Sequence, residues 1–500
     1  MKQSRTLSQL GRFLVLLLLA GAFAPLAAPQ AIDAWAPQAS TPPFALVVTD
    51  PGRGLVPFPP VHATLLPDRR VMLFATTGIR QRAAWFVPAP IDQDPPSGIV
   101  VLTADNVPVD VDPPISVTDG AGRQWYVEET LFCSGHSLMA DGSLFVAGGT
   151  LLYSIFDPLA QVTVNYIYGM PNATLYSYPT NTWSRLDNMR GTGAAGQVLR
   201  WYGTVTRLAD ERMLVASGSE LAEVQVRRPG QPTEHHPGTH NRSLEIWLPS
   251  AVPGGVVSEH AETPSEVWNP DYTHAFQSPY ATATNYVLMF GAAGVPVYFT
   301  PDGPPGSRWF TLSNMPRPGA RSIDPPNHGA SSVLLPLRAS NFEWGYANGS
   351  VMQAGGGRES AMERSIDFFE ITSGWAQGID TGFRRRYPAT VLLPDGKVLV
   401  VSGYDATGTN PALRNAHYLD PRPPASFSTG TAAMGEVRGY HNVALLLPDG
   451  RVFVAGGRSA GEAGPEDEKP SFRYLYPPYM SPRESPPPRP AITAAPATIG

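Results

Sequence analysis

The chain has 500 residues, of which 42% are hydrophobic, 48 are glycine and 54 are proline, a composition that supports a large core and many turns and argues against long helices. Its formal charge of -6, from 36 basic and 42 acidic residues, gives no reason to expect a nucleic acid or an anionic membrane as a partner. The one basic triplet, Arg384 to Arg386, is interpreted as a solvated edge.

The first 31 residues have the features of a secretory signal peptide. Three basic residues (Lys2, Arg5 and Arg12) come before an apolar run at residues 13–19, and small residues follow it. The apolar run is too short to cross a bilayer, and no other segment approaches ~18 uncharged apolar residues. We therefore expect residues 1–31 to be removed and the mature protein to be secreted, into a periplasm or outside the cell, without a membrane span.

A short unit recurs along residues 32–484, in which an apolar segment meets an Asp-Gly-like turn and a second apolar segment ends in small residues. Because Asp-Gly adopts the positive φ of tight hairpins, each copy predicts a strand, a turn and a strand. Residues 285–291 and 331–357 resemble degenerate copies and bring the number of units to seven. The clear copies are residues 65–74, 139–149, 208–218, 392–403 and 446–457.

Seven such hairpins predict an all-β fold, a seven-bladed Kelch-type β-propeller over residues 32–484. A hairpin cannot bury both of its faces alone, whereas four-stranded blades packed around an axis leave only short edges. The spacing between successive turns leaves room for two outer strands in each blade. A β-sandwich, the competing all-β fold, would not need the same hairpin seven times.

Residues 485–500 are predicted to be a linker followed by the start of a C-terminal β-sandwich domain that is incomplete in this chain. Ser485 to Pro490 is rich in proline, which is typical of a stiff, extended connector. The ten residues after it resemble the opening of a β domain and are too few to form one. The alternative is that they form a last strand that packs on the propeller.

Three short strings each precede a predicted hairpin directly. Equivalent positions in different blades lie near one mouth of the propeller axis, so one cysteine, two tyrosines and one histidine are expected to meet there. Taken alone, the only cysteine would be interpreted as a buried small hydrophobe and the Tyr-His pair as packing. The strings are Phe132-Cys133, Arg200-Trp201-Tyr202 and Arg438-Gly439-Tyr440-His441-Asn442.

In their order and placement, these strings resemble the copper-radical oxidases, the family of glyoxal oxidase and galactose oxidase. The resemblance covers most of the mature chain. It implies a thioether bond between Cys133 and Tyr202, and copper ligation by Tyr202, Tyr440 and His441. The family's second histidine ligand comes from the domain after the propeller, so none of the ten histidines of this chain is assigned to that role.

The resemblance also implies a function, that of a secreted oxidase which removes two electrons from an aldehyde or primary alcohol and reduces O2 to H2O2. Phenolate and imidazole suit copper(II). Since one copper carries one electron, a radical on Tyr202, tuned by the Cys133 sulfur, would supply the second. Tyr440 would be an axial phenolate ligand that takes the proton of the substrate. The expected partners are a small aldehyde or alcohol and O2, and the chain is expected to be a monomer.

A competing hypothesis from another class is a non-catalytic extracellular Kelch propeller that binds a glycan or a protein. This hypothesis would not require Cys133, Tyr202, Tyr440 and His441 to converge.

Two further expectations concern individual segments. Arg200 and Arg438 are expected to anchor backbone or carboxylate groups beneath the site, because a guanidinium can form two parallel hydrogen bonds. The histidine-rich segment 234–240 is expected to be a solvated loop rather than a second metal site.

Overall fold

The described residues of the computed structural model form strands almost throughout, with short 3-10 turns such as Pro411–Arg414 and Pro478–Met480. The predicted signal peptide and the predicted linker lie outside the described residues. No helix in the described part of the chain is long and apolar enough to cross a membrane. The structure describes residues 33–480 apart from gaps at 37–41, 79–81, 92–97, 106, 110–113, 190–197, 242, 249–255, 263–272, 279–285, 291–295, 305–306, 312–328, 336–349, 359–360, 371–373, 423 and 461–466.

Most of the strands belong to sheets of four. Five such sheets occur among the described residues, and each is ordered from its earliest strand to its latest. The strands of the first three are β10 (Gly135–Leu138), β11 (Leu144–Ala147), β14 (Asn172–Ser177) and β15 (Thr182–Asn188); β16 (Thr204–Arg207), β17 (Met213–Ala216), β20 (Ser243–Leu248) and β21 (Val256–Glu262); and β22 (His274–Gln277), β23 (Val287–Phe290), β24 (Val297–Phe299) and β25 (Trp309–Thr311). The other two contain β26 (Ala330–Leu334), β27 (Val351–Gly355), β30 (Ser365–Glu370) and β31 (Gly374–Asp380), and β32 (Ala389–Leu392), β33 (Val398–Val401), β34 (Asn415–Asp420) and β35 (Ser426–Ala433).

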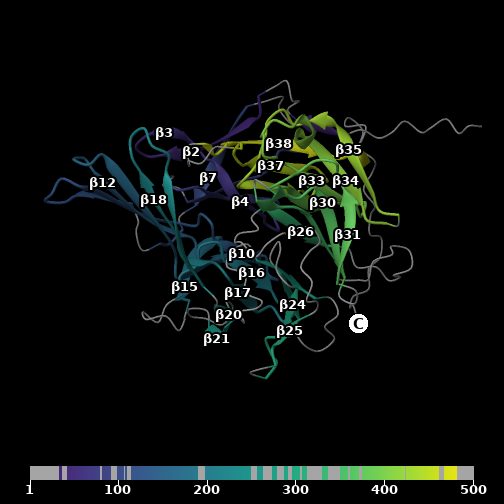
Figure 1. Ribbon diagram of the computed structural model, residues 1–500, viewed down its shortest axis with the longest axis horizontal. Helices are drawn as coiled ribbons and strands as arrows, with labels where there is room; N and C mark the ends of the chain where they lie inside the picture. Colours follow the sequence, from purple (N-terminus) through teal and green to yellow (C-terminus); the bar gives the residue numbers. More distant parts are fainter. Residues whose placement is uncertain are drawn as a thin grey trace, which may run out of the picture.

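A ten-stranded sheet joins the two ends of the described chain. Its strand β38 (Ser471–Tyr476) pairs antiparallel with β1 (Ala34–Ala36) and with β2 (Phe44–Asp50). Figure 1 shows the purple strands β2, β4 and β7 beside the yellow strands β37 and β38. The remaining strands of this sheet are β3 (Gly54–Pro57), β4 (Pro60–Leu65), β5 (Val71–Ala75), β6 (Ala83–Phe86), β7 (Ile99–Asp105), β36 (Asn442–Leu446) and β37 (Val452–Gly456). A small two-stranded sheet is formed by β28 (Gly357–Arg358) and β29 (Ala361–Met362).

Each of the five clear repeats forms the predicted β-hairpin. The turns depend on a positive φ, which Gly396 and Gly450 adopt at 83° and 96° and which Arg69 and Glu211 adopt where glycine is replaced. An aspartate before the turn residue accepts a hydrogen bond from the backbone, as Asp449 does from the N–H two residues later at 3.0 Å. The degenerate copies also contribute paired strands, β23 and β26–β27. The five hairpins are β4–β5, β10–β11, β16–β17, β32–β33 and β36–β37.

The first strands of neighbouring sheets lie against one another. Contacts join β32 to β36, β36 to β4, β10 to β16, β16 to β22 and β26 to β32. Adjacent sheets share apolar cores, as where Val391, Leu399 and Val401 of one sheet pack with Val452 and Val454 of the next. The predicted all-β fold is confirmed, and the segments that lead into the first strands are drawn toward one another.

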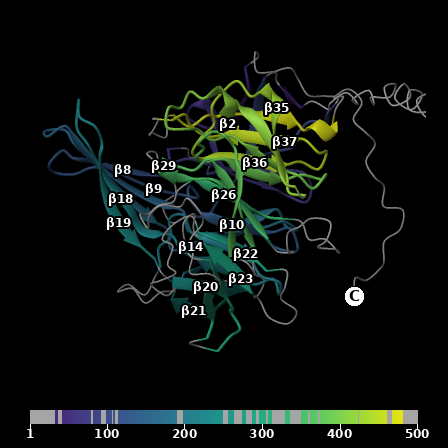
Figure 2. The ribbon, with the colours of Figure 1, turned by 45° about the vertical axis from the view of Figure 1, so that its right-hand side comes forward.

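A six-stranded sheet extends away from the four-stranded ones, as Figures 1 and 2 show on the left of both views. Its hairpin β12–β13 is inserted between β11 and β14, and its hairpin β18–β19 is inserted between β17 and β20. A third hairpin, β8–β9, leads into the Phe132-Cys133 string. The sheet is formed by β8 (Ile115–Thr118), β9 (Gln124–Thr130), β12 (Thr150–Asp157), β13 (Val162–Gly169), β18 (Ser219–Arg227) and β19 (Glu234–His240).

Two sequence interpretations are wrong. The histidine-rich segment is strand β19, because its backbone pairs with β18 from Ser219 to Val226. The basic triplet is not uniformly solvated, since Arg385 is 4% exposed. Its guanidinium Nη2 lies 2.8 Å from Nδ1 of the buried His417, which therefore acts as the acceptor.

This buried pair predicts a loss of stability in mild acid. Burial, with the nearby charge of Arg385, lowers the pKa of His417 to about 2. Because an unfolded histidine takes up a proton below about pH 6.5 and the folded one does not, stability falls as the pH decreases, by about 2 kcal/mol between pH 7 and pH 5. Urea unfolding should show a smaller decrease over this range for His417→Gln than for the wild type. The exposed control His236→Gln should follow the wild type, and an unchanged slope for His417→Gln would contradict the assignment.

Candidate active site

The tyrosine and histidine side chains of two strings meet at one point. The hydroxyl of Tyr202, which precedes β16, lies 2.7 Å from Nε2 of His441, which precedes β36. The same hydroxyl is hydrogen-bonded to the hydroxyl of Tyr440. The rings of Tyr440 and His441 stack with centroids 3.7 Å apart. Two phenol oxygens and one imidazole nitrogen are thus brought together, although Tyr202 and His441 are 239 residues apart in sequence.

Cys133 lies beside this group. Cys133 is 0% exposed, and its backbone carbonyl accepts a hydrogen bond of 2.7 Å from the backbone N–H of Tyr202. The neighbouring Phe132 ring meets the His441 ring edge to face, with centroids 5.0 Å apart. All four predicted site residues are therefore in one neighbourhood.

Three of these residues have a left-handed backbone. The φ angles of Cys133, Tyr202 and His441 are 60°, 58° and 67°. For a residue with a side chain this conformation costs about 1–2 kcal/mol, and such strain concentrates at functional sites. From these turns, the side chains of Tyr202 and His441 reach each other.

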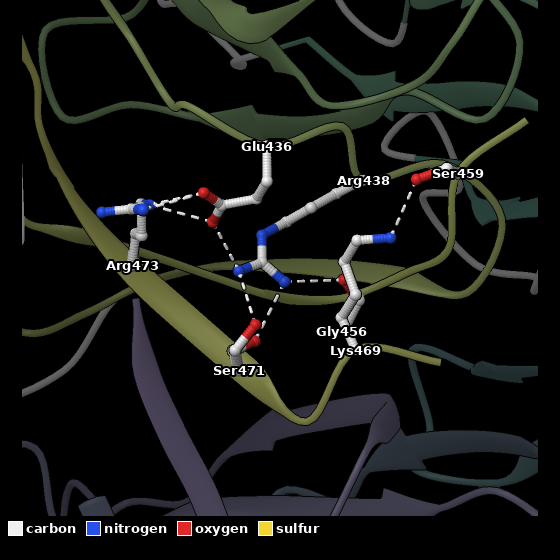
Figure 3. A network of polar contacts seen from close by, with 7 residues as sticks. All are labelled: Glu436, Arg438, Gly456, Ser459, Lys469, Ser471 and Arg473. Atoms are coloured by element: carbon white, nitrogen blue, oxygen red, sulfur yellow. Dashed lines mark hydrogen bonds and ion pairs between the residues drawn. The ribbon is translucent and has the colours of Figure 1, made fainter. Parts of the chain in front are cut away.

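Each of the two strings that contain a tyrosine is anchored by a buried arginine. Arg438 is 0% exposed and donates to the carbonyls of Gly456 and Ser471 at 2.8 and 3.0 Å and to Glu436 at 2.7 Å. Figure 3 shows this network, in which Glu436 also accepts from Arg473. The expected anchoring role of Arg438 is confirmed.

Arg200 holds the other string in the same way. It is also 0% exposed, donates to the Ser217 carbonyl at 2.6 Å and to the Ser243 hydroxyl at 2.8 Å, and lies 3.4 Å from the Glu245 carboxylate. The anchoring role expected of Arg200 is confirmed as well.

Glu468 orients His441 and was not predicted from the sequence. Its Oε1 lies 2.5 Å from Nδ1 of His441, so Nδ1 carries the proton and Nε2 is left as the acceptor facing the tyrosines. Burial lowers the pKa of His441, and the Glu468 carboxylate opposes that shift. The Oε2 atom of Glu468 is buried and accepts no hydrogen bond within the described part of the chain. Nothing in the sequence around Glu468 indicates this pairing.

Tyr387 is a second residue that sequence reasoning missed. Its ring lies 4.8 Å from that of Tyr440, centroid to centroid, and its φ is 55°. A signal was available, because Tyr387 stands two residues after Arg385 and shortly before β32, as Tyr202 stands after Arg200 before β16.

A cavity of about 310 Å³ opens above the group. Phe132, Trp201, Tyr440 and His441 line its lower part, and residues of the six-stranded sheet line one side. Trp201 lines the cavity and also contacts the Tyr202 ring, whose centroid is 4.1 Å from its own. The cavity gives a small molecule access to Tyr440 and His441.

The donor atoms suit a metal that prefers nitrogen and oxygen in a tetragonal arrangement. The two hydroxyls and Nε2 of His441 converge, and the other nitrogen of that ring has a carboxylate partner, as metal-bound histidines usually have. Elsewhere among the described residues, no cluster of three or more His, Cys, Asp or Glu side chains could hold a metal ion.

The known proteins that are similar to this chain include two galactose oxidases and an alcohol oxidase. No protein-family model matches the chain. Two galactose oxidase sequences from Gibberella zeae, one of them from strain PH-1, are each 21% identical to it over 346 residues, which is 66% of this chain and 43% of theirs. A solved structure of a fungal alcohol oxidase of the AA5 family, in complex with copper, has a TM-score of 0.55 at 17% identity and covers 93% of this chain and 80% of that one.

The chain resembles the copper-radical oxidases in sequence and in fold. It matches less than half the length of the galactose oxidases. The similarity to these oxidases is seen in a sequence alignment and in the fold. The convergence of the two tyrosines with His441 is a separate observation, seen in interatomic distances.

The anchoring by Arg438 can be tested by stability. Arg438→Lys keeps the charge but cannot reach Gly456, Ser471 and Glu436 together, so we expect a loss of about 2–4 kcal/mol in urea unfolding. The control Arg422→Lys alters an arginine whose side chain is 50% exposed, and should change stability by less than about 0.5 kcal/mol. Equal effects of the two substitutions would show that the buried network does not hold the string.

Proposed function

We propose that the chain is a secreted copper-radical oxidase that oxidises a primary alcohol or an aldehyde and reduces O2 to H2O2. The observation that carries this proposal is the meeting of Tyr202, Tyr440 and His441, with Cys133 beside Tyr202. The competing hypothesis, a non-catalytic propeller that binds a glycan or a protein, does not require this convergence.

The hydroxyl oxygens of Tyr202 and Tyr440 and Nε2 of His441 would hold copper. Copper bound there would supply a centre that accepts one electron. Tyr202, joined to Cys133 by a thioether, would supply the other centre as a phenoxyl radical, because the sulfur donates electron density to the ring. Making the thioether removes one hydrogen from the thiol and one from the ring, with O2 as the oxidant.

Tyr440 is suited to take the proton of the substrate hydroxyl. A phenol is a poor base near neutral pH and acts as one only as phenolate. The guanidinium of Arg458 lies 4.7 Å from the Tyr440 ring centroid and favours the negative form. With Tyr202 taking a hydrogen atom from the carbon, the substrate gives up two protons and two electrons, which is what O2 needs to become H2O2.

We also propose the domain boundaries given by the sequence. Dividing the ten-stranded sheet at the junction of β38 and β2 gives, with the five sheets of four strands, seven blades over residues 32–484. Residues 1–31 would be the signal peptide, and the segment from 485 onward would lead into a β domain. A second histidine ligand would come from such a domain, as the family resemblance implies.

The proposed thioether has a direct mass signature. After copper loading in air, peptide mass spectrometry should find the peptides containing Cys133 and Tyr202 joined, with a mass about two hydrogens below their sum. Cys133→Ser should give separate peptides and lose peroxide release with primary alcohols. Finding separate peptides and an alkylatable Cys133 in the wild type would refute the radical cofactor and favour the binding hypothesis.

Glu468 should tune the copper site through His441. Glu468→Gln keeps an acceptor for Nδ1 but removes the negative charge, so copper affinity should decrease by about tenfold to a hundredfold. The measurement is competition with a chelator, with the copper spectrum as a second readout. The exposed turn residue Glu211 provides the control Glu211→Gln, whose affinity should equal that of the wild type. If both variants bind copper equally well, Glu468 does not act on the ligand.

A further inference from the structure

The six-stranded sheet has two chemically different faces. Side chains alternate along each strand, and the pairing register places Ser154, Asn165, Gln225 and His235 side by side on β12, β13, β18 and β19. The opposite face carries apolar and aromatic residues at the intervening positions, among them Tyr153, Tyr166, Val224 and Val226. The polar face is the one that lines the cavity above Tyr440 and His441.

The polar residues on this face are linked to one another. Nδ1 of His235 lies 2.8 Å from Oε2 of Glu223, and the Gln225 amide is hydrogen-bonded to the same carboxylate. The amide of Asn165 lies 3.5 Å from that of Gln225. Because these side chains hold one another in place, little conformational entropy would be lost when they bind a ligand.

The polarity of the cavity wall changes along the strands of the six-stranded sheet. The base of the sheet lies against the Arg200-Trp201 backbone, where Gly169 leaves no room for a side chain. In the next cavity-facing row, Leu152 and Ile167 are apolar, and Glu223 stands opposite Ile167 on β18. The row beyond it is polar and contains Asn165 and Gln225. Two residues along a strand span roughly 6.6 Å. On the β12–β13 side of the cavity, an apolar strip of about that height, formed by Leu152 and Ile167, therefore separates the base of the sheet from the amide of Asn165.

We propose that this sheet face, defined by Asn165, Glu223, Gln225, Arg227 and His235, is the substrate-selecting surface of the site. It selects primary alcohols or aldehydes that have an apolar segment next to the reacting carbon and a hydroxyl-type group at the far end. Leu152, Ile167 and Trp201 contact the apolar segment, and the amides of Asn165 and Gln225 bind the distal hydroxyl. The cavity volume of about 310 Å³ is in the range of small-molecule sites. This inference rests on the proposed function.

The experiment compares α,ω-diols with primary alcohols of the same length. Peroxide release by the copper-loaded chain is measured with butane-1,4-diol, hexane-1,6-diol and octane-1,8-diol and with the matching 1-alkanols. Above one chain length, kcat/KM per reactive hydroxyl should be about three- to tenfold higher for the diol, the value of one added hydrogen bond. Gln225→Leu should bring that ratio close to one. The control Val224→Ala changes the adjacent residue on the opposite face and should keep the wild-type ratio.

A second measurement does not depend on oxidation. Saturation-transfer NMR with the copper-free chain should give a stronger signal for octane-1,8-diol than for 1-octanol, and Gln225→Leu should remove the difference. Asn165→Leu replaces Gln225→Leu if the latter fails to fold by circular dichroism.

The outcomes separate the two proposals. Oxidation of diols and alcohols at equal rates at every length, or rate ratios that Gln225→Leu leaves unchanged, would overturn the selecting surface and leave the oxidase intact. If neither compound is oxidised, the proposed function fails, and the NMR comparison alone decides whether the face binds a distal hydroxyl. Equal NMR signals for octane-1,8-diol and 1-octanol would overturn the proposed selecting surface.

Discussion

The position of the tyrosines at the candidate site depends on guanidinium groups buried between strands. Arg200, Arg385 and Arg438 each stand two residues before a tyrosine, and each donates to a backbone carbonyl at or just after the second strand of its sheet, those of Ser217, Val400 and Gly456. A charge taken out of water is costly unless it is fully paired. Each string is therefore favoured in the place where the terminal guanidinium nitrogens reach these carbonyls. The convergence of side chains from separate sheets follows from these local constraints.

The strain at the site is compatible with this anchoring. Cys133, Tyr202 and His441 adopt left-handed backbone angles that isolated residues avoid. The hydrogen bond between the Cys133 carbonyl and the Tyr202 amide, together with the Arg200 and Arg438 networks, fixes the chain on both sides of these residues. The surrounding contacts thus offset the unfavourable angles, and the phenol and imidazole groups are held in place before any ligand arrives.

Sequence patterns predicted the parts of the fold that are encoded locally. The hairpins follow from Asp-Gly-like turns, whose geometry depends on a few adjacent residues, and the placement of Tyr202, Tyr440 and His441 follows from their position just before the hairpins. The six-stranded sheet was missed because β19 is polar and rich in histidine, and it is a strand only through its pairing with β18. The contact of Glu468 with His441 was missed because the two residues are 27 apart in sequence, on either side of the β36–β37 hairpin, and no local motif connects them. The burial of Arg385 depends on His417, which no local motif connects to it.

Two hairpins of the six-stranded sheet are insertions into four-stranded sheets. Its hairpins β12–β13 and β18–β19 leave and re-enter between strands that are paired with each other, β11 with β14 and β17 with β20. The two ends of each hairpin are therefore neighbours whatever its length, and lengthening or shortening it does not alter the path of the chain that carries Tyr202. Evolution can therefore change the length and sequence of these hairpins while the anchored residues stay constant. Relatives of this chain can then differ in the molecules that enter the cavity and still share the arrangement of Tyr202, Tyr440 and His441.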